Sequence, residues 1–321
     1  MTARVQSETR KITIQRKGQR QKVLCIENRY SARSGADEHE RESTEMSQKI
    51  QVVATGMAVV FTFGLSTAMA IEGITGDVAP GSGGFVGLGV AYTPDYEGSD
   101  EYEAFPIPFG AYHWQSGRYV ELGGTAGSEQ AVRLKANVIA DDMSSAWQFG
   151  PLLQYRLKRD DVENTQVDNM KEVDGATEAG AFVGFTAGLW SANLSFAGDV
   201  SDEHDGYLVY LDGSYSLFAD NTMHLSLDTH ITYADSNYME TYFGVDVKNV
   251  GTSGLSNYKA SSGIKDAGLA LTGSYAFSKT WGIIGNVSYT RMLNDAEDSP
   301  LVNDEGTENQ LGALVAVSYA F

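Results

Sequence analysis

The chain ends in Leu311-Gly-Ala-Leu-Val-Ala-Val-Ser-Tyr-Ala-Phe321, the stretch that decides its fold. Counted back from the end, every second residue is apolar, in the order Phe321, Tyr319, Val317, Val315, Ala313 and Leu311. The residues between them are small and mixed in character. A period of two indicates a β-strand with one apolar face. A strand of about ten residues that ends on an aromatic is typical of the last strand of an outer-membrane β-barrel.

Similar alternation recurs in earlier segments of the chain, each followed by a polar break. The sequence therefore predicts an all-β fold, a transmembrane antiparallel up-and-down β-barrel of about 12 strands over residues 83–321. Ten strands is the rival count, because charged residues interrupt two segments. Apolar rows are expected to face lipid and polar rows the lumen. The candidate strands are 83–92, 104–114, 117–126, 129–140, 146–158, 177–189, 192–200, 206–218, 222–234, 264–277, 281–293 and 308–321.

The breaks alternate between short and long, which predicts short periplasmic turns and longer extracellular loops. All four tryptophans fall at the short breaks: Trp114 and Trp190 end predicted strands, whereas Trp147 and Trp281 begin them. Together with Phe321 they are expected to form a periplasmic aromatic girdle at the headgroup level. The longest break, 234–263, is long enough to fold into the lumen as a plug or constriction.

The front of the chain carries a targeting signal. An apolar stretch at 51–65 is too short to span a bilayer comfortably and is followed by Ala68-Met-Ala70, a small-residue cleavage site. The sequence predicts a signal peptide over 46–70, cut after Ala70, with Met46 as the true initiator. Residues 1–45 are then an artefactual extension, and 71–82 are a short periplasmic lead-in. The expected location is the outer membrane of a Gram-negative cell.

Charge and cysteine content agree with export. Residues 1–70 hold 11 of the 23 Lys and Arg and 7 of the 42 Asp and Glu, which leaves 12 basic and 35 acidic residues and a formal charge of −23. Such a surface excludes nucleic acid as a partner. Cys25, the one cysteine of the chain, lies before the predicted cleavage site, so the exported part has no disulfide.

The sequence predicts no catalytic, cofactor-binding or metal-binding site. Neither a Gly-x-Ser-x-Gly elbow beside a plausible base nor a His-Glu-x-x-His motif occurs. His204 lies among acidic residues of a predicted outer loop, and His224 and His230 share the lumen face of one strand with Asp228. We interpret these histidines as polar packing. A basic stripe on the inner wall is also expected, formed by Arg133, Lys135, Arg156 and Lys158.

Several short motifs, taken together and in order, resemble the MipA/OmpV family across about 83–321. They begin with Tyr92-Thr-Pro-Asp-Tyr96-Glu-Gly98-Ser99-Asp100 and Phe105-Pro106-Ile-Pro108, continue with Arg159-Asp160-Asp161 and Tyr242-Phe243-Gly244-Val245, and end with Asp298-Ser299-Pro300-Leu301-Val302 and Tyr319-Ala-Phe321. Apart from the last strand, we expect these motifs in outer loops or at their edges, where structural roles are favoured over binding roles.

The resemblance implies a scaffold that links a membrane-bound lytic transglycosylase to a peptidoglycan synthase. Other members resemble adhesins, so a surface adhesin is one alternative; a narrow channel for small solutes is the other. Further expected partners are outer-membrane lipid and lipopolysaccharide, and the barrel-assembly machinery, whose signal the terminal Phe321 resembles. No cofactor is expected.

Overall fold

The computed structural model describes residues 11–13, 22–24, 82–124, 129–140 and 146–321. The chain divides into two units, Met1–Ala58 and Val59–Phe321. In the first, β1 (Lys11–Thr13) pairs antiparallel with β2 (Lys22–Leu24). The predicted signal peptide over 46–70 and its cleavage after Ala70 lie outside the described residues, as do most of the extension 1–45 and of the lead-in 71–82.

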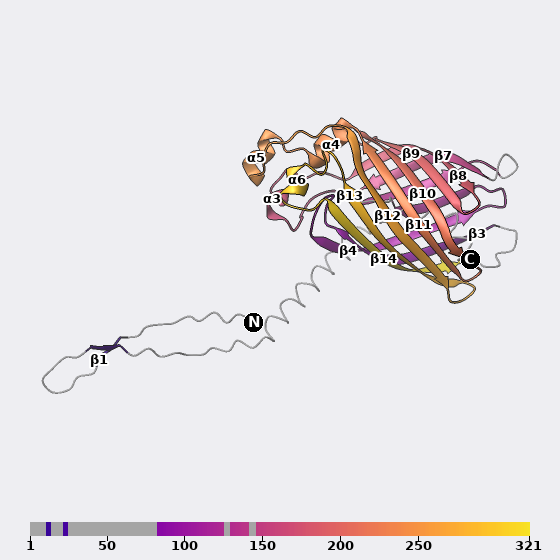
Figure 1. The fold of residues 1–321 in the computed structure, drawn as a ribbon, viewed down its shortest axis with the longest axis horizontal. Helices are drawn as coiled ribbons and strands as arrows, with labels where there is room; N and C mark the ends of the chain where they lie inside the picture. The colour runs from indigo at the N-terminus through magenta and orange to yellow at the C-terminus, as the bar shows by residue number, and fades with distance from the viewer. Residues whose placement is uncertain (1–10, 14–21, 25–81, 125–128, 141–145) are drawn as a thin grey trace. The chain divides into compact units, whose positions relative to one another are not determined.

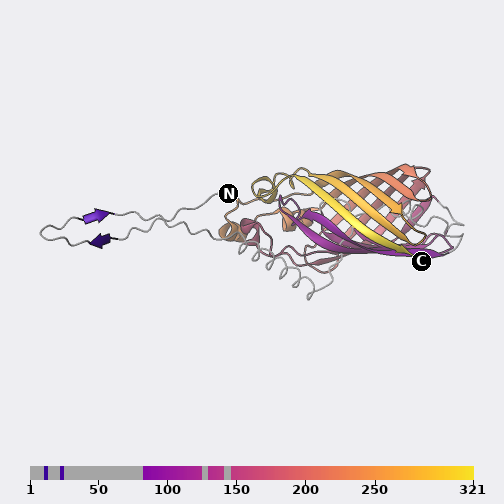
Figure 2. The same ribbon diagram turned by 90° about the horizontal axis from the view of Figure 1, so that it is seen from below.

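Twelve antiparallel strands form a closed barrel in the second unit (Figure 1). The predicted strand number is confirmed, and the rival count of ten is wrong. Figure 2 shows the strands running obliquely around the barrel. They are β3 (Gly83–Pro94), β4 (Tyr102–His113), β5 (Tyr119–Gly124), β6 (Ala131–Asn137), β7 (Trp147–Arg156), β8 (Ala176–Ala187), β9 (Trp190–Asp199), β10 (Tyr207–Ala219), β11 (Met223–Ala234), β12 (Gly263–Ala276), β13 (Trp281–Met292) and β14 (Asn309–Ala320).

The last strand closes the barrel against the first, as the sequence predicts. β14 pairs with β3 from Ala313 opposite Tyr92 to Ala320 opposite Phe85. Beyond that ladder, Phe321 and Gly84 exchange both backbone hydrogen bonds, at 2.9 and 3.0 Å. The C-terminal residue is therefore part of the seam.

The predicted alternation of faces is confirmed. In β11 the polar row, which contains His224, Asp228 and His230, is buried, whereas Leu227 and Ile231 of the apolar row are exposed. In this strand polar side chains therefore face the interior and apolar side chains the outer wall, the inversion expected of a barrel surrounded by hydrocarbon. Part of the interior is nevertheless apolar, where Phe85, Ile107 and Leu314 pack together.

One β-bulge changes this alternation. Where β11 pairs with β12, Thr232 faces Asp266 and Tyr233 faces Ile264, so Lys265 is the extra residue. Lys265 and Asp266 are adjacent in sequence, yet both side chains are fully buried inside the barrel. The bulge thus places two charged groups where strict alternation would place one.

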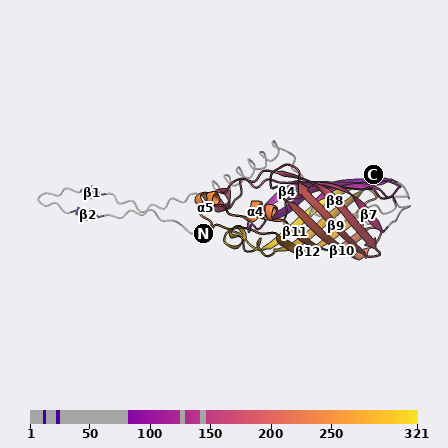
Figure 3. The same cartoon turned by 90° about the horizontal axis from the view of Figure 1, so that it is seen from above.

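The two ends of the barrel differ. The end that carries the C-terminus is formed by short turns, and we call it the short-turn end (Figure 1). The opposite, long-loop end carries α3 (Thr165–Asp168), α4 (Ser236–Phe243), α5 (Val247–Ser253) and α6 (Pro300–Asn303) (Figures 1 and 3). No helix in the described part of the chain is long and apolar enough to cross a membrane.

Candidate functional site: the capped mouth of the barrel

Family-motif residues from distant loops meet at the long-loop end, where they form what we call the cap, made of loops 95–101, 157–175, 235–262 and 293–308. The buried Tyr96 donates its hydroxyl hydrogen to the carbonyl oxygens of Leu301 and Glu305, at 3.3 and 3.1 Å. Burial raises the pKa of Tyr96, so it remains a neutral donor. The motif at 92–100 therefore contacts the motif at 298–302 directly.

Gly98 and Ser99 continue this contact. Gly98 has a φ of +98°, and a Cβ at this position would lie 2.4 Å from Cγ2 of Val302. Glycine is thus required both by the backbone and by the close approach of α6. The Gly98 carbonyl accepts a hydrogen bond from the Thr307 amide at 2.8 Å, and the buried Ser99 accepts one from the Glu101 amide.

Ser299 joins its own loop, 293–308, to loop 235–262. Its hydroxyl donates to the Phe243 carbonyl at 2.7 Å and also caps α6, which has Pro300 in its first turn. Serine before a proline is a common start for a helix because the hydroxyl satisfies a free amide. Gly244 ends α4, and its amide donates to the Glu240 carbonyl at 3.0 Å.

The residues of the middle motif, Arg159-Asp160-Asp161, differ in position: the arginine contacts the cap, and the two aspartates face outward. Arg159 donates from Nη1 to the Tyr242 carbonyl at 2.9 Å. Asp160 pairs with Lys158, whose side chain is 59% exposed, and Asp161 has a φ of +49°. Asp100 and Asp298 are exposed and take no comparable part in the cap.

Pro106 and Pro108 lie in a strand, within the predicted segment 104–114, rather than in an outer loop. Both are inside β4, opposite Val90 and Leu88 of β3. On its other edge β4 pairs with β5 only from Gly110 to His113, just after the prolines. A proline has no amide hydrogen to offer a neighbouring strand, so this short ladder is the physical consequence of the motif.

A buried ion cluster lies beneath the cap. Arg156 is 2% exposed and pairs with Glu178, Glu97 and Glu129, at 2.8, 3.1 and 3.4 Å. Lys265, from the bulge, pairs with Asp266 and also lies 3.2 Å from Glu97 and 3.6 Å from Glu129. Burial raises the pKa of Glu129 to about 6, against the opposing effect of the two cations. Removing one buried partner would leave the charges of the others without compensation, so the cluster is a single unit.

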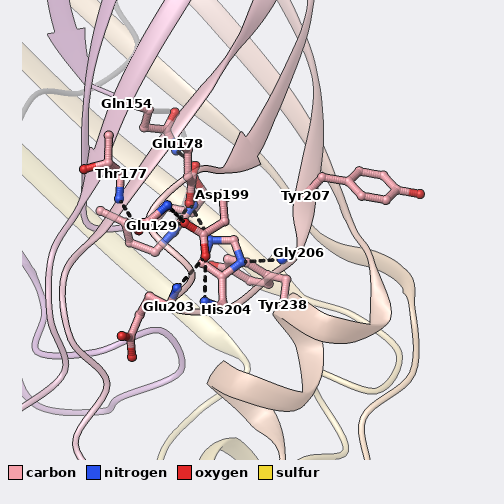
Figure 4. Close-up of polar contacts among 12 residues, drawn as sticks. Glu129, Gln154, Thr177, Glu178, Asp199, Glu203, His204, Gly206, Tyr207 and Tyr238 are labelled. Atoms are coloured by element: carbon pink, nitrogen blue, oxygen red, sulfur yellow. Dashed lines mark hydrogen bonds and ion pairs between the residues drawn. The ribbon is translucent and has the colours of Figure 1, made fainter.

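His204 extends the cluster on one side (Figure 4). Its Nδ1 accepts the Gly206 amide hydrogen at 3.1 Å, so its other nitrogen, Nε2, carries the proton and donates to Glu178 at 3.2 Å. The Asp199 carboxylate accepts amide hydrogens from Glu203 and His204 and holds this loop in place. Both ring nitrogens are occupied, which supports the interpretation of His204 as polar packing.

α4 covers the cluster, so the loop 234–263 does fold inward. The Tyr238 hydroxyl donates to Glu97 at 2.7 Å. The Arg156 guanidinium lies 4.7 Å from the centre of the Tyr238 ring and 5.5 Å from that of Tyr242. Burial raises the pKa of both tyrosines, which remain neutral. An aromatic helix face thus lies directly over a buried cation.

The predicted basic stripe is present in part: Arg133, Lys135 and Arg156 face the lumen, whereas Lys158 does not. Lys135 pairs with Glu121 at 2.7 Å, Arg156 belongs to the ion cluster, and Lys158 is exposed. Arg133 faces the lumen, where it donates to Gln154 at 2.7 Å and lies 4.1 Å from the centre of the Tyr210 ring. The positive charge is not continuous, because the Glu121 and Glu178 carboxylates pair with Lys135 and Arg156.

The lumen histidines do not form a common site. His224 contacts Ser216 and His230 contacts Thr290, while Asp228 accepts hydrogen bonds from hydroxyls of neighbouring strands. Within the described residues, no group of three or more His, Cys, Asp or Glu is placed to hold a metal ion.

The aromatic residues of the predicted girdle lie at the short-turn end and are exposed: Trp114, Trp147, Trp190, Trp281 and Phe321. One detail is corrected. Trp190 begins β9 rather than ending the strand before it, because Gly188 adopts a φ of +60° and makes the turn two residues earlier than expected. A periplasmic girdle remains a prediction.

Sequence reasoning missed Glu97, Glu129, Glu178 and Lys265 as members of one cluster. The sequence of the strand around Glu178 does not indicate an ion cluster, and Lys265 faces the lumen only because of the bulge. The one available signal was the adjacent pair Lys265-Asp266 at the start of a strand, where a charged neighbour breaks the expected alternation.

Comparison with known proteins identifies the family. The model of the family described as "MltA-interacting protein MipA" matches residues 86–321. The MltA-interacting proteins of Escherichia coli (strain K12) and Shigella flexneri are each 23% identical over 259 residues, which cover 81% of this chain and 95% of theirs. Among solved structures, the NanC porin has a TM-score of 0.42 at 11% identity and covers 73% of this chain and 98% of its own. An outer membrane channel from Pseudomonas putida F1 has a TM-score of 0.40 at 10% identity, with 75% and 96% covered. On the match over residues 86–321, this chain belongs to the MltA-interacting protein MipA family.

Proposed function

We propose that this chain is a non-enzymatic outer-membrane protein that holds a lytic transglycosylase at the cell wall. The observation that carries the proposal is the family match over residues 86–321, because relatives are named for interaction with MltA. More specifically, we propose that the chain is a scaffold that also binds a peptidoglycan synthase.

The outer-membrane location is supported by the closed barrel and its apolar outer wall. A closed barrel satisfies every strand hydrogen bond without an open edge, which hydrocarbon demands. Lipid and lipopolysaccharide are the proposed contacts of this wall. The proposed orientation has the short-turn end in the periplasm, after export directed by the signal peptide over 46–70.

The cap supports a binding role over that of an open pore. α4 and the ion cluster fill the long-loop mouth with fixed contacts, so a partner has to meet the outside of the barrel. A partner in the periplasm meets the short-turn end, where Arg118 and Lys279 are exposed.

The proposal is tested by the affinity of the purified barrel, in detergent, for a soluble lytic transglycosylase. We expect saturable binding, and we expect R118E/K279E to weaken it several-fold. The matched control is K171E/K248E, which reverses two exposed cations at the long-loop end. Absence of binding to the wild-type barrel overturns the proposal that a lytic transglycosylase is the partner. Equal weakening by both double variants overturns the assignment of the short-turn end.

A further inference from the structure

A hollow of about 530 Å³ lies in the outer wall of the barrel, across strands β9 to β13. Four of these strands, β10 to β13, lie side by side in Figure 1. The large side chains that line the hollow, among them Leu211, Ile231 and Leu269, belong to the outward-facing rows of their strands and are exposed. The hollow therefore opens to the surroundings of the barrel. Its volume is in the range of about 300–1,000 Å³ that is typical of small-molecule sites.

Small residues form the floor of the hollow. Ala192, Gly213 and Thr229 are successive partners in the ladders that join β9, β10 and β11. A Cβ at Gly213 would lie 2.9 Å from Oγ1 of Thr229, so the glycine keeps the floor low at this point. The Thr229 hydroxyl donates to the Gly213 carbonyl at 3.4 Å, which satisfies the one side-chain hydroxyl of the floor. The floor is therefore apolar.

The lining continues in one direction across the strands. Beyond Thr229, the same row leads to Leu269 of β12 and Tyr289 of β13, and both residues line the hollow. Five neighbouring strands at a spacing of about 4.8 Å give a length of about 19 Å. Half of the hydrocarbon core of a bilayer measures about 15 Å. An elongated apolar hollow of this length fits one extended acyl chain.

Three charged groups lie at the long-loop end of the hollow. Arg291 is opposite Ala267, a lining residue, and is two positions beyond Tyr289 on the same face of β13. Its guanidinium is half-exposed and pairs with Glu297 at 2.5 Å and with Glu308 at 3.3 Å. Both carboxylates are themselves partly exposed. The group therefore offers one cation and two anions to a ligand, with a net charge of −1.

This arrangement of charge complements a zwitterionic lipid headgroup. Phosphoethanolamine carries a phosphate, which a guanidinium binds, and an ammonium, which a carboxylate binds. A headgroup that carries phosphate alone would place its charge against two carboxylates as well as one arginine. Arg291 is close to the end of β13, where the apolar wall meets the polar loops, and this is the level of the headgroups around a membrane barrel.

We infer that the hollow binds one molecule of phosphatidylethanolamine. One acyl chain lies along the floor from Tyr289 towards Ala192, the phosphate contacts Arg291, and the ammonium contacts Glu297 and Glu308. The inference rests on the proposed outer-membrane location, because the wall has to face lipid. It is independent of the proposed transglycosylase partner, which meets the short-turn end.

Native mass spectrometry of the detergent-purified barrel, titrated with palmitoyl-oleoyl phosphatidylethanolamine, tests the headgroup. We expect one lipid to be retained per barrel. Phosphatidylglycerol with the same chains lacks the ammonium and should be retained about fivefold more weakly, an effect of the size found for partly exposed ion pairs. R291Q should weaken the retention of both lipids, and E297Q/E308Q should abolish the preference between them.

A second set of variants tests the acyl-chain site. A267F fills the hollow and should weaken the retention of both lipids about tenfold, as expected when about two methylene groups lose their contacts. The matched control is A181F, which adds the same ring to an exposed alanine of β8 outside the hollow. Folding is checked by heat-modifiable migration in gels. Should A267F misfold, A192F fills the opposite end of the hollow and takes its place.

Each other outcome counts against a stated part of the inference. A folded wild-type barrel that retains no lipid, or equal losses in A267F and A181F, overturns the site. Stronger retention of phosphatidylglycerol or of lipopolysaccharide overturns the headgroup, and a barrel dimer that A267F dissociates assigns the hollow to a second copy of the chain instead. Transglycosylase binding should be the same in A267F and wild type, so failure of the lipid site and failure of the proposed partner are distinguishable.

Discussion

Arg156 is the residue with the most contacts in the buried ion cluster. Its guanidinium, 2% exposed, faces three carboxylates and two tyrosine rings. We expect R156M to lower the free energy of unfolding by about 3–5 kcal/mol, because removing one partner leaves buried charges without compensation. Urea unfolding in detergent micelles measures this loss.

The control for Arg156 is R291M, which removes a half-exposed arginine and should cost far less, since solvent screens its ion pairs. R156M/E178Q should recover part of the stability, because it also removes one stranded carboxylate. Equal losses in R156M and R291M would show that the cluster contributes nothing beyond an ordinary surface pair.

Glu129 gives a prediction on pH. Its pKa in the folded protein is raised from 4.5 to about 6, so the folded state binds the proton more tightly than the unfolded chain. The stabilising contribution of Glu129 to the free energy of unfolding therefore increases as the pH falls through 6 and is fully present below 4.5. It is lost as the pH rises again through 6. We expect E129Q to remove this part of the pH dependence, measured as the difference in unfolding free energy between pH 7 and pH 5. Identical pH profiles of the two proteins would contradict the raised pKa.

At the scale of elements, β14 combines the closing ladder with the terminal aromatic. We expect deletion of Phe321 to lower outer-membrane insertion several-fold, because the deletion removes two seam hydrogen bonds to Gly84 and the aromatic that resembles an assembly signal. Membrane fractionation measures the folded share. F277A, at an exposed aromatic of the same end, serves as the control. Unchanged assembly after the deletion, or an equal defect in F277A, counts against this role.

The strands and loops also show which features of the fold can be predicted from the sequence. β11 and β14 were predictable because period-two alternation is local: neighbouring residues alone decide which face is buried. The bulge at Lys265 depends on register with another strand, and the tie from Ser299 to Phe243 joins residues far apart in sequence. No local pattern encodes such contacts, so the motif residues were found while their assembly into a cap was not.

At the scale of the whole molecule, maturation gives a prediction outside the described residues. We expect cleavage after Ala70, which would leave Ile71 as the first residue of the exported protein. N-terminal sequencing of the protein from purified outer membranes checks this, with A70W as a variant that should retain the precursor because a bulky residue blocks the small-residue site. Recovery of residues 1–45 on the exported protein would refute both the cleavage site and Met46 as the initiator.

The seam between Gly84 and Phe321 fixes the order of biogenesis. The two strands that meet there are the first and last of the barrel, so a chain that lacks β14 cannot close. Until β14 pairs with β3, the barrel strands present two unpaired edges, which invite aggregation. Pairing the two ends of the barrel also demands the longest loop closure available to the chain, which is slow. We therefore expect the strands to need protection from aggregation until β14 pairs with β3, and a frameshift that removes β14 to prevent closure as fully as an early one.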